Sequence, residues 1–141
     1  MLNIHSFFSF RYGVLSISTL IDRLLIMGYS DFVLTDINSS SGQISFIREC
    51  QKKGIKARIG IDFRHANKKC FVAIAKNEEG VRELNHHLTQ YLKHPTYNQL
   101  VNHHFSNCFI IYYLHNYPEI LKENECIGVG IEDVKSVINH I

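Results

Sequence analysis

Signals that would assign this chain to several common classes of protein are absent from its sequence. None of the four cysteines forms a C-x-x-C pair, so a zinc ribbon is not expected. No apolar run reaches the roughly 18 residues that a membrane-spanning helix needs, and the first residues lack the pattern of a secretory signal peptide. No glycine-rich segment with Lys and Ser or Thr forms a phosphate-binding loop. These absences predict a cytoplasmic protein with reduced thiols and no membrane association.

Excess charge of either sign is also lacking. The formal net charge of +2 over 141 residues is too small to indicate nucleic-acid binding by charge alone. The composition, with 45% hydrophobic and 20% charged residues, is typical of a globular protein. Because no linker rich in Pro, Gly or Ser and no internal repeat is found, residues 1–141 are predicted to form a single domain.

The hydrophobic pattern predicts alternating strands and helices. Strands are predicted at residues 2–4, 32–35, 55–63, 70–75, 108–114 and 127–129. Helices are predicted from Ser16 or Ser18 to Met27 and at residues 43–53, 81–92 and 98–103, with a turn at 66–67 and a turn or helix at 119–124. Asn or Ser side chains of residues 38–41 are expected to cap the helix at 43–53. This alternation favours an α/β architecture with a largely parallel sheet. A last helix, from residue 132 to residue 140, has no stop signal, so we expect the fold to continue beyond Ile141.

Three candidate site residues follow the first three predicted strands. They are His5, Asp36 and Asp62, and their spacing is close to one strand–helix repeat of roughly 30 residues. The carboxyl ends of consecutive parallel strands meet on one face of a sheet or barrel, and α/β folds place their sites there. Imidazole and carboxylate groups bind metal ions, so the pattern predicts a metal or phosphate site.

Five segments spread over the chain form a pattern that is specific when taken together. They are N-I-H-S-F-F-S (3–9), V-L-T-D-I-N (33–38) with Ser41-Gly42, G-I-K-A-R-I-G-I-D-F (54–63), A-K-N-E-E-G-V-R-E-L (75–84) and E-N-E-C-I-G-V (123–129). The pattern resembles the PHP (polymerase and histidinol phosphatase) domain, and the fourth segment is similar to the branch at the amino end of bacterial DNA polymerase III alpha subunits. The resemblance implies the N-terminal part of a distorted (βα)7 TIM-like barrel, whose active members bind two or three metal ions and hydrolyse phosphoesters. The rest of the barrel and the polymerase core would lie outside this chain.

The chain departs from the metal-binding pattern of active members in the first two motifs. Asn3 stands at the first position of His-x-His, and His5 at the second. The Thr-Asp-His motif keeps Asp36, but Ile37 replaces its histidine. A neutral amide is a weak ligand for zinc or manganese, and an aliphatic side chain is none.

The next two motifs are altered rather than lost. Asp62 replaces a glutamate on a shorter arm, and Cys70 replaces a histidine, where a thiolate could bind zinc. The resemblance therefore implies a residual set of Zn or Mn ligands formed by His5, Asp36, Asp62 and Cys70. Arg11, in the loop after His5, is a candidate phosphate contact. We interpret the site as degenerate.

Several of these residues also have purely structural interpretations. His5 could be a buried histidine bonded to the backbone. Asp36 could cap a helix or stabilise a turn, and Cys70 could be a small core residue. Arg11 could lie in a solvated loop.

Other interpretations concern pairs of residues. Asp62 could form an ion pair with Arg58 or Arg64 rather than bind a metal. Adjacent histidines on a helix point about 100° apart, so the pairs at 86–87 and 103–104 are expected on the surface.

Two functions of different classes follow from the resemblance. The preferred one is a structural or interaction module of a replicative DNA polymerase III alpha subunit. Its partners would be other holoenzyme subunits and a separate proofreading exonuclease, with DNA bound through the parent polymerase. The alternative is an active metal-dependent phosphoesterase, either a 3′–5′ proofreading exonuclease or a small-molecule phosphatase. A plain α/β domain with only a structural role is the third possibility.

Overall fold

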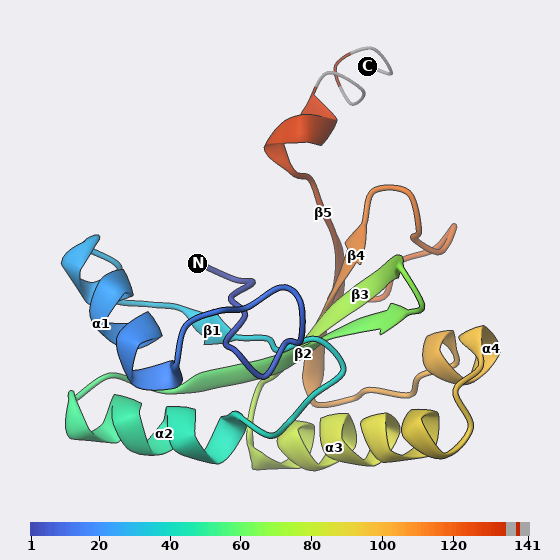
Figure 1. The fold of residues 1–141 in the computed structure, drawn as a ribbon. Helices are drawn as coiled ribbons and strands as arrows, with labels where there is room; N and C mark the ends of the chain where they lie inside the picture. Colours follow the sequence, from blue (N-terminus) through green and yellow to red (C-terminus); the bar gives the residue numbers. More distant parts are fainter. Residues whose placement is uncertain (135–137, 139–141) are drawn as a thin grey trace.

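The computed structural model describes residues 1–134 and residue 138, and these form a five-stranded sheet packed against helices (Figure 1). In sheet order the strands are β1 (Val33–Leu34), β2 (Arg58–His65), β3 (Lys68–Ala75), β4 (Cys108–Tyr113) and β5 (Glu125–Gly128). The helices are α1 (Ile17–Ile26), α2 (Gln43–Lys52), α3 (Glu78–Lys93), α4 (Tyr97–Val101) and the 3₁₀ turn η1 (Ile131–Asp133). The predicted α/β class is confirmed.

Side-chain caps explain where two of the helices begin. The Ser16 hydroxyl accepts a hydrogen bond from the Thr19 N–H at 3.3 Å, so α1 starts at the first of its two predicted positions. α3 starts earlier than predicted because the Asn77 side chain accepts from the Gly80 N–H at 2.9 Å. The expectation for α2 is wrong, since its N-cap is Gly42 and no side chain caps it.

The sheet is mixed, which corrects the expectation of a largely parallel one. β1–β2 and β4–β5 are parallel, whereas β2–β3 and β3–β4 are antiparallel. The short turn at residues 66–67, with Ala66 in the left-handed region at φ 52°, can join only antiparallel strands. Residue Asn107 lies against the start of α3, where its carbonyl accepts from the Lys76 N–H at 2.9 Å. β4 therefore begins where β3 ends, and Cys108 pairs with Ala75.

The limits of two predicted strands differ from the prediction in ways that affect the candidate site. The one at residues 2–4 is reduced to a single parallel bridge between Ile4 and Leu34. β2 continues past the predicted end to His65, so Asp62 lies within this strand and not at its end. The helix predicted from residue 132 to residue 140 lies largely outside the described residues. Over residues 1–134, no helix is long and apolar enough to cross a membrane.

The core consists of two main clusters, one on each half of the sheet. The first joins α1 and α2 to β1 and contains Ile4, Ile17, Leu20, Ile21, Leu24, Phe32, Leu34, Phe46, Cys50 and Ile59. The second joins α3 to β2, β3 and β4 and contains Ile61, Phe63, Cys70, Phe71, Ala73, Leu84, Leu88, Tyr91, Leu100, Cys108, Ile110 and Tyr112. α2 and α3 lie along the same side of the sheet (Figure 1). We call the side of β2–β4 that α3 covers the α3 face.

Two histidines that were expected on the surface belong to this core. His87 and His103 are 8% and 9% exposed and pack around the Phe71 ring. The His87 Nε2 lies 2.8 Å from the Leu100 carbonyl oxygen, and the His103 Nε2 lies 3.0 Å from the Tyr112 hydroxyl. The expectation was wrong because the two side chains of each pair point in different directions. His87 and His103 point into the core, and His86 and His104 are exposed.

Candidate functional site

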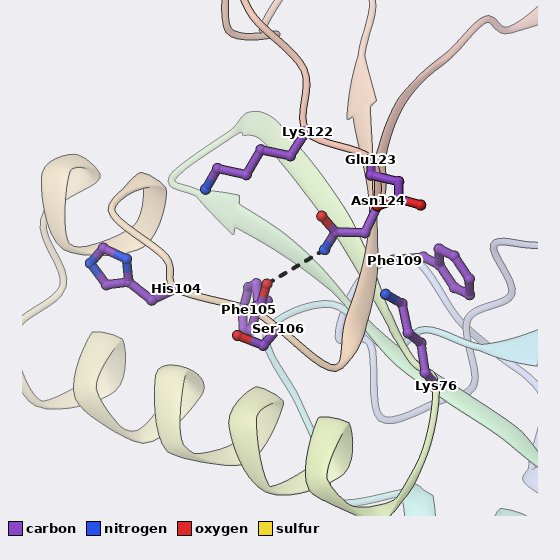
Figure 2. A pocket seen from close by; sticks show the side chains of 8 residues that line it. All are labelled: Lys76, His104, Phe105, Ser106, Phe109, Lys122, Glu123 and Asn124. Atoms are coloured by element: carbon purple, nitrogen blue, oxygen red, sulfur yellow. Dashed lines mark hydrogen bonds between the residues drawn. The ribbon is translucent and has the colours of Figure 1, made fainter.

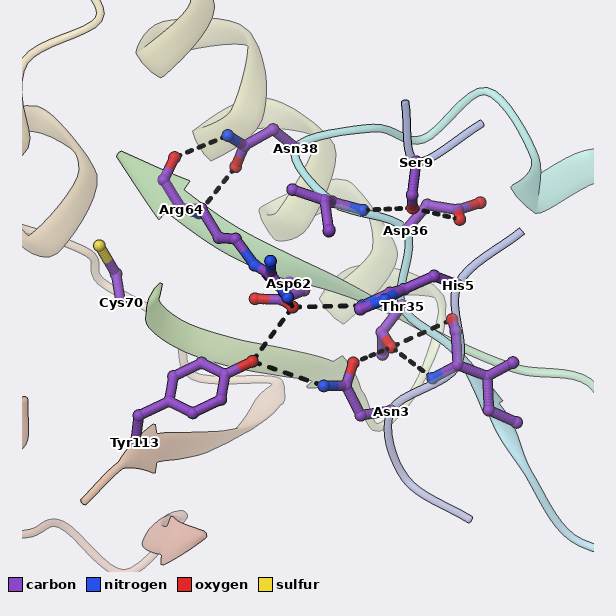
Figure 3. Close-up of polar contacts among 12 residues, drawn as sticks. Asn3, His5, Ser9, Thr35, Asp36, Asn38, Asp62, Arg64, Cys70 and Tyr113 are labelled. Atoms are coloured by element: carbon purple, nitrogen blue, oxygen red, sulfur yellow. Dashed lines mark hydrogen bonds and ion pairs between the residues drawn. The ribbon is translucent and has the colours of Figure 1, made fainter. Parts of the chain in front are cut away.

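Two of the predicted site residues, His5 and Asp62, meet on the side of the sheet opposite the α3 face, which we call the site side. Side chains alternate along a strand, so Ile61 and Phe63 of β2 enter the α3-face core while Asp62 and Arg64 point the other way. His5 reaches the same place because its neighbour Ile4 bridges to β1. Four segments of the chain therefore meet around one carboxylate, as Figure 3 shows.

Asp62 is the centre of this arrangement. Its carboxylate is fully buried, and its Oδ2 accepts hydrogen bonds from Arg64 Nη2 at 2.6 Å and Nε at 3.1 Å. The Tyr113 hydroxyl donates to the same oxygen at 3.1 Å, and His5 Nε2 lies 3.2 Å away. The other oxygen, Oδ1, is buried without a hydrogen-bond partner among the described residues. We call Asp62, Arg64, His5, Tyr113 and Asn3 the Asp62 network.

Electrostatics keep the Asp62 carboxylate and the Arg64 guanidinium charged. Burial acts to raise the pKa of Asp62, but the hydrogen bonds from His5 and Arg64 outweigh it and hold that pKa below its usual range. Burial likewise acts to lower the pKa of Arg64, but the Asp62 carboxylate outweighs it and the pKa is raised. Burial and the Asp62 charge both raise the pKa of Tyr113, which therefore stays a neutral donor.

Asn3 belongs to the network as a hydrogen-bonding residue. Its amide oxygen, the atom that would bind a metal, accepts from the Thr35 hydroxyl at 2.7 Å. Its amide nitrogen donates to the Tyr113 hydroxyl at 3.4 Å. Both halves of the Asn3 amide are thus engaged with protein groups.

The Asp36 carboxylate forms a separate set of hydrogen bonds that fixes the loop after His5. Its Oδ1 accepts from the Ser6 N–H and the Ser9 hydroxyl, both at 2.7 Å, and its Oδ2 accepts from the Ser6 hydroxyl at 2.7 Å. The residue is 2% exposed. Its structural role is therefore to hold a loop and not to cap α2, whose N-cap is Gly42.

Backbone contacts connect the Asp36 segment to the Asp62 network. The Asp62 N–H donates to the Asp36 carbonyl at 3.2 Å, and Ile37 bridges to Asp62 in the parallel sense. Asn38 continues this contact, since its side chain accepts from the Arg64 N–H at 2.9 Å and donates to the Arg64 carbonyl at 2.6 Å. His5 and Asp62 therefore meet through their side chains as predicted, whereas Asp36 approaches Asp62 only through its backbone, and Asp62 is not at a strand end.

Cys70 is not brought to this network, and a β-bulge explains why. Phe63 pairs with Phe71, but Arg64 pairs with Lys69, so Cys70 is an extra residue on β3. Its side chain joins the α3-face core together with that of Phe71, and its thiol lies 3.5 Å from the Lys68 carbonyl. Figure 3 draws Cys70 without a contact to the other labelled side chains. Strict alternation along the strand would have placed Cys70 on the site side.

The loop after His5 contributes an aromatic cover rather than a charge. Arg11 is exposed, with a left-handed backbone at φ 72°. The ring of Tyr12, its neighbour, lies 4.6 Å from the Arg64 guanidinium carbon. Arg11 as a phosphate contact stays a prediction. Of the two arginines weighed as partners of Asp62, Arg64 is the one that binds it, and Arg58 pairs with Asp31 at 2.8 Å.

The side chains as arranged do not fit a two-metal cluster. Such a cluster needs several anionic and imidazole donors around two cations about 3.5–4 Å apart. The Asp36 oxygens already accept three hydrogen bonds, and Asp62 Oδ2 already contacts a cationic guanidinium. Within residues 1–134, no three His, Cys, Asp or Glu side chains are grouped so that they could hold a metal ion.

Two pockets lie near different parts of the sheet. One of about 600 Å³ opens beside Asn3 and Tyr113 of the network. The other, of about 560 Å³, is separate from the network and is shown in Figure 2. It is lined by Lys76, His104, Phe105, Ser106, Phe109, Lys122, Glu123 and Asn124. Its two lysines and one glutamate give it no strong preference for one charge.

Comparisons with known proteins agree with this architecture. The profile of the PHP domain family matches residues 2–127. The DNA polymerase III subunit alpha of Borreliella burgdorferi is 32% identical over 87 residues, which are 62% of this chain and 7% of that protein. The crystal structure of a protein from Bifidobacterium adolescentis, assigned as a metal-dependent phosphoesterase, superposes with a TM-score of 0.52 at 9% identity. This match covers 98% of the chain and 73% of that structure, and at such low identity it shows the fold alone.

Proposed function

Because the chain belongs to the PHP domain family, we propose that it is the PHP domain of a DNA polymerase III alpha subunit, acting as a structural or interaction module with a degenerate metal site. The observation that carries the second part is the Asp62–Arg64 pair, in which a protein cation occupies the carboxylate oxygen that also contacts the candidate ligand His5. The similarity to the B. burgdorferi polymerase subunit supports the first part.

Further features support a module rather than an enzyme. Asn3 and Ile37 stand at positions where active members of the family carry histidines, and the Asn3 amide is engaged by Thr35 and Tyr113. The sheet side beside the network exposes apolar surface, with Leu2 60% and Phe109 52% exposed. Such surface suits contact with another part of a larger protein.

The proposed setting follows from the same assignment. Residues 1–141 would form one domain that continues into the rest of a PHP barrel and then a polymerase core. Other holoenzyme subunits and a separate proofreading exonuclease would be its partners in the cytoplasm, and DNA would be bound by the parent polymerase.

One observation favours the alternative, an active metal-dependent phosphoesterase. The Oδ1 of Asp62 is a buried carboxylate oxygen without a partner among the described residues, and such an atom is a candidate metal ligand. With this oxygen, Asp36 and His5 would supply the remaining donors, and zinc or manganese would be the metal.

Metal analysis combined with a hydrolysis assay separates the two functions. The purified chain would be dialysed against Mn²⁺ or Zn²⁺, and bound metal and hydrolysis of bis(p-nitrophenyl) phosphate would be measured. We expect less than one tightly bound ion per chain, and the same background hydrolysis in the Asp36→Ala variant. Stoichiometric metal, with hydrolysis lost in Asp36→Ala, would establish the phosphoesterase instead.

The polymerase assignment has its own test. Sequencing the reading frame beyond the codon for Ile141 is expected to reveal the rest of the barrel and a polymerase core with paired catalytic aspartates. A stop codon at that point, or an unrelated domain after it, would contradict the assignment.

A further inference from the structure

We propose that Arg64 takes the place of a divalent cation at Asp62, so that the chain neutralises its buried carboxylate with its own guanidinium. The inference rests on the degenerate site of the proposed function, but it does not depend on the polymerase assignment. It predicts that the stability of the wild type does not depend on divalent metal ions, whereas that of a variant without Arg64 does.

The geometry of the pair supports this role. The Arg64 and Asp62 side chains are 7% and 0% exposed, so a charge on either one needs compensation inside the protein. Both lie on the same side of β2 because they are two positions apart on a strand. Nε and Nη2 of Arg64 converge on Oδ2 at 3.1 and 2.6 Å, and the Tyr12 ring lies over the guanidinium.

The same contacts leave no room for a metal ion at Oδ2. A zinc–carboxylate bond is about 2.0–2.2 Å long, and this oxygen is already surrounded by two Arg64 nitrogens, the Tyr113 hydroxyl and His5 Nε2. An ionised carboxylate can only accept hydrogen bonds. The His5 nitrogen that contacts Asp62 must therefore carry a proton, and a protonated ring nitrogen cannot bind a metal.

Without Arg64 the situation reverses. Oδ2 would lose its cation, and Oδ1 has no partner among residues 1–134 even now. The buried carboxylate would then have no cation beside it, with Oδ1 unpartnered and Oδ2 in contact only with the Tyr113 hydroxyl and His5 Nε2. A hard divalent cation such as Mn²⁺ is the ligand class that such a site would take.

Thermal unfolding of the full chain with and without MnCl₂ tests the inference. For Arg64→Met we expect a melting temperature lower by on the order of 10 °C, because breaking a buried pair leaves an uncompensated charge. Millimolar Mn²⁺ should restore a large part of this loss, whereas it should leave the wild type unchanged. Arg58→Met is the matched control, since Arg58 is also on β2 and pairs with Asp31, but both side chains are exposed. It should show a small loss and no response to Mn²⁺.

Two further variants keep the test decisive if Arg64→Met folds poorly. Asp62→Asn/Arg64→Met removes both charges, and should be more stable than Arg64→Met and indifferent to Mn²⁺. Arg64→Lys keeps a cation, and should also be indifferent. The inference is overturned if Mn²⁺ does not raise the melting temperature of Arg64→Met. It is also overturned if Asp62→Asn/Arg64→Met is as unstable as Arg64→Met. Tight Mn²⁺ binding by the wild type would instead contradict the degenerate site of the proposed function.

Discussion

The two sides of the sheet bury titratable groups in opposite states. On the site side, Asp62 and Arg64 are both charged, and each shifts the pKa of the other toward the charged form. On the α3 face, burial lowers the pKa of His87 and lowers that of His103 to about 4, so both imidazoles are neutral at pH 7. The difference shows that burial alone does not decide the charge. The charge of Asp62 is preserved by Arg64, a counter-ion two positions away on the same strand. The aromatic side chains around His87 and His103 provide no such counter-charge.

The strongest way to break this comparison is to remove the anion. Asp62→Ala would leave the Arg64 guanidinium buried without its partner, and we expect the free energy of unfolding to fall by about 4 kcal/mol. Urea unfolding followed by far-UV circular dichroism measures this change. Asp31→Ala is the control, because its ion pair with Arg58 is exposed and should contribute little. Equal losses in the two variants would show that burial of the Asp62 pair is unimportant.

Mild acid should lower the stability of the protein mainly through the buried histidine His103 on the α3 face. The folded-state pKa of His103 is about 4 and its ordinary value is 6.5, so only the unfolded chain takes up this proton between those values. Stability is then fully present above pH 6.5 and falls toward pH 4, by roughly 3 kcal/mol from this residue. The charged and titratable neighbours of His103 are His87, His104, Glu125 and Lys122. Urea unfolding at several pH values between 7 and 4 measures the loss.

A His103→Gln variant is the control for the acid experiment. It can still bond to the Tyr112 hydroxyl but does not titrate, so its stability should depend less steeply on pH. The Asp62 contribution should be unaffected over this window, because its lowered pKa means that it is lost only below the ordinary value of 3.8. An unchanged pH dependence in His103→Gln would assign the acid sensitivity to other groups.

A smaller loss of stability is expected for the second buried carboxylate among the predicted site residues, that of Asp36. Asp36 is stabilised by hydrogen bonds from Ser6 and Ser9, and no cation of residues 1–134 forms an ion pair with it. Asp36→Asn keeps its size but replaces one acceptor oxygen with a donor, and we expect a loss of about 2 kcal/mol. Hydrogen exchange of the Ser6 and Ile37 amides should accelerate most. The Ser6 N–H donates to Asp36, and the Ile37 N–H donates to the Ser9 hydroxyl. Uniform acceleration over the whole chain would contradict a local role.

The smallest expected effect concerns the hydroxyl of Tyr113. Tyr113→Phe removes the donor that joins Asn3 to Asp62 but leaves Arg64 in place. The free energy of unfolding should fall by about 1 kcal/mol, as measured by urea unfolding. A loss as large as that of Asp62→Ala would mean that the guanidinium is not the main source of compensation.

Local patterns in the sequence were sufficient for much of the fold. Ser16 and the apolar spacing after it predicted α1, and the turn at residues 66–67 predicted a break between two strands. The reversed direction of β3 was not predicted, because periodicity does not reveal whether a neighbouring strand runs parallel. The contact between His5 and Asp62 was predicted from their similar places in successive repeats, but the separate position of the Asp36 carboxylate was not.

The rest of the site depends on contacts that no local pattern contains. Tyr113 meets Asp62 across the sheet, and its position at the end of an apolar strand gave no sign of this. Arg58 and Arg64 are both an even number of positions from Asp62 on β2, so alternation along the strand does not distinguish them. Arg64 is two positions from Asp62 and Arg58 is four, so the shorter separation along the strand was the available signal for Arg64.

The bulge at Cys70 has a consequence for protein engineering and for the history of this chain. Residues at positions 3, 37 and 64 can each be exchanged in place, one codon at a time. Position 70 differs, because the register of β3 turns its side chain into the α3-face core whatever the residue is. In this register, a metal-binding side chain placed at position 70 would enter the α3-face core, and loss of one residue from the hairpin would be one way to turn it to the site side. Such a loss changes the chain length, which point substitutions cannot do.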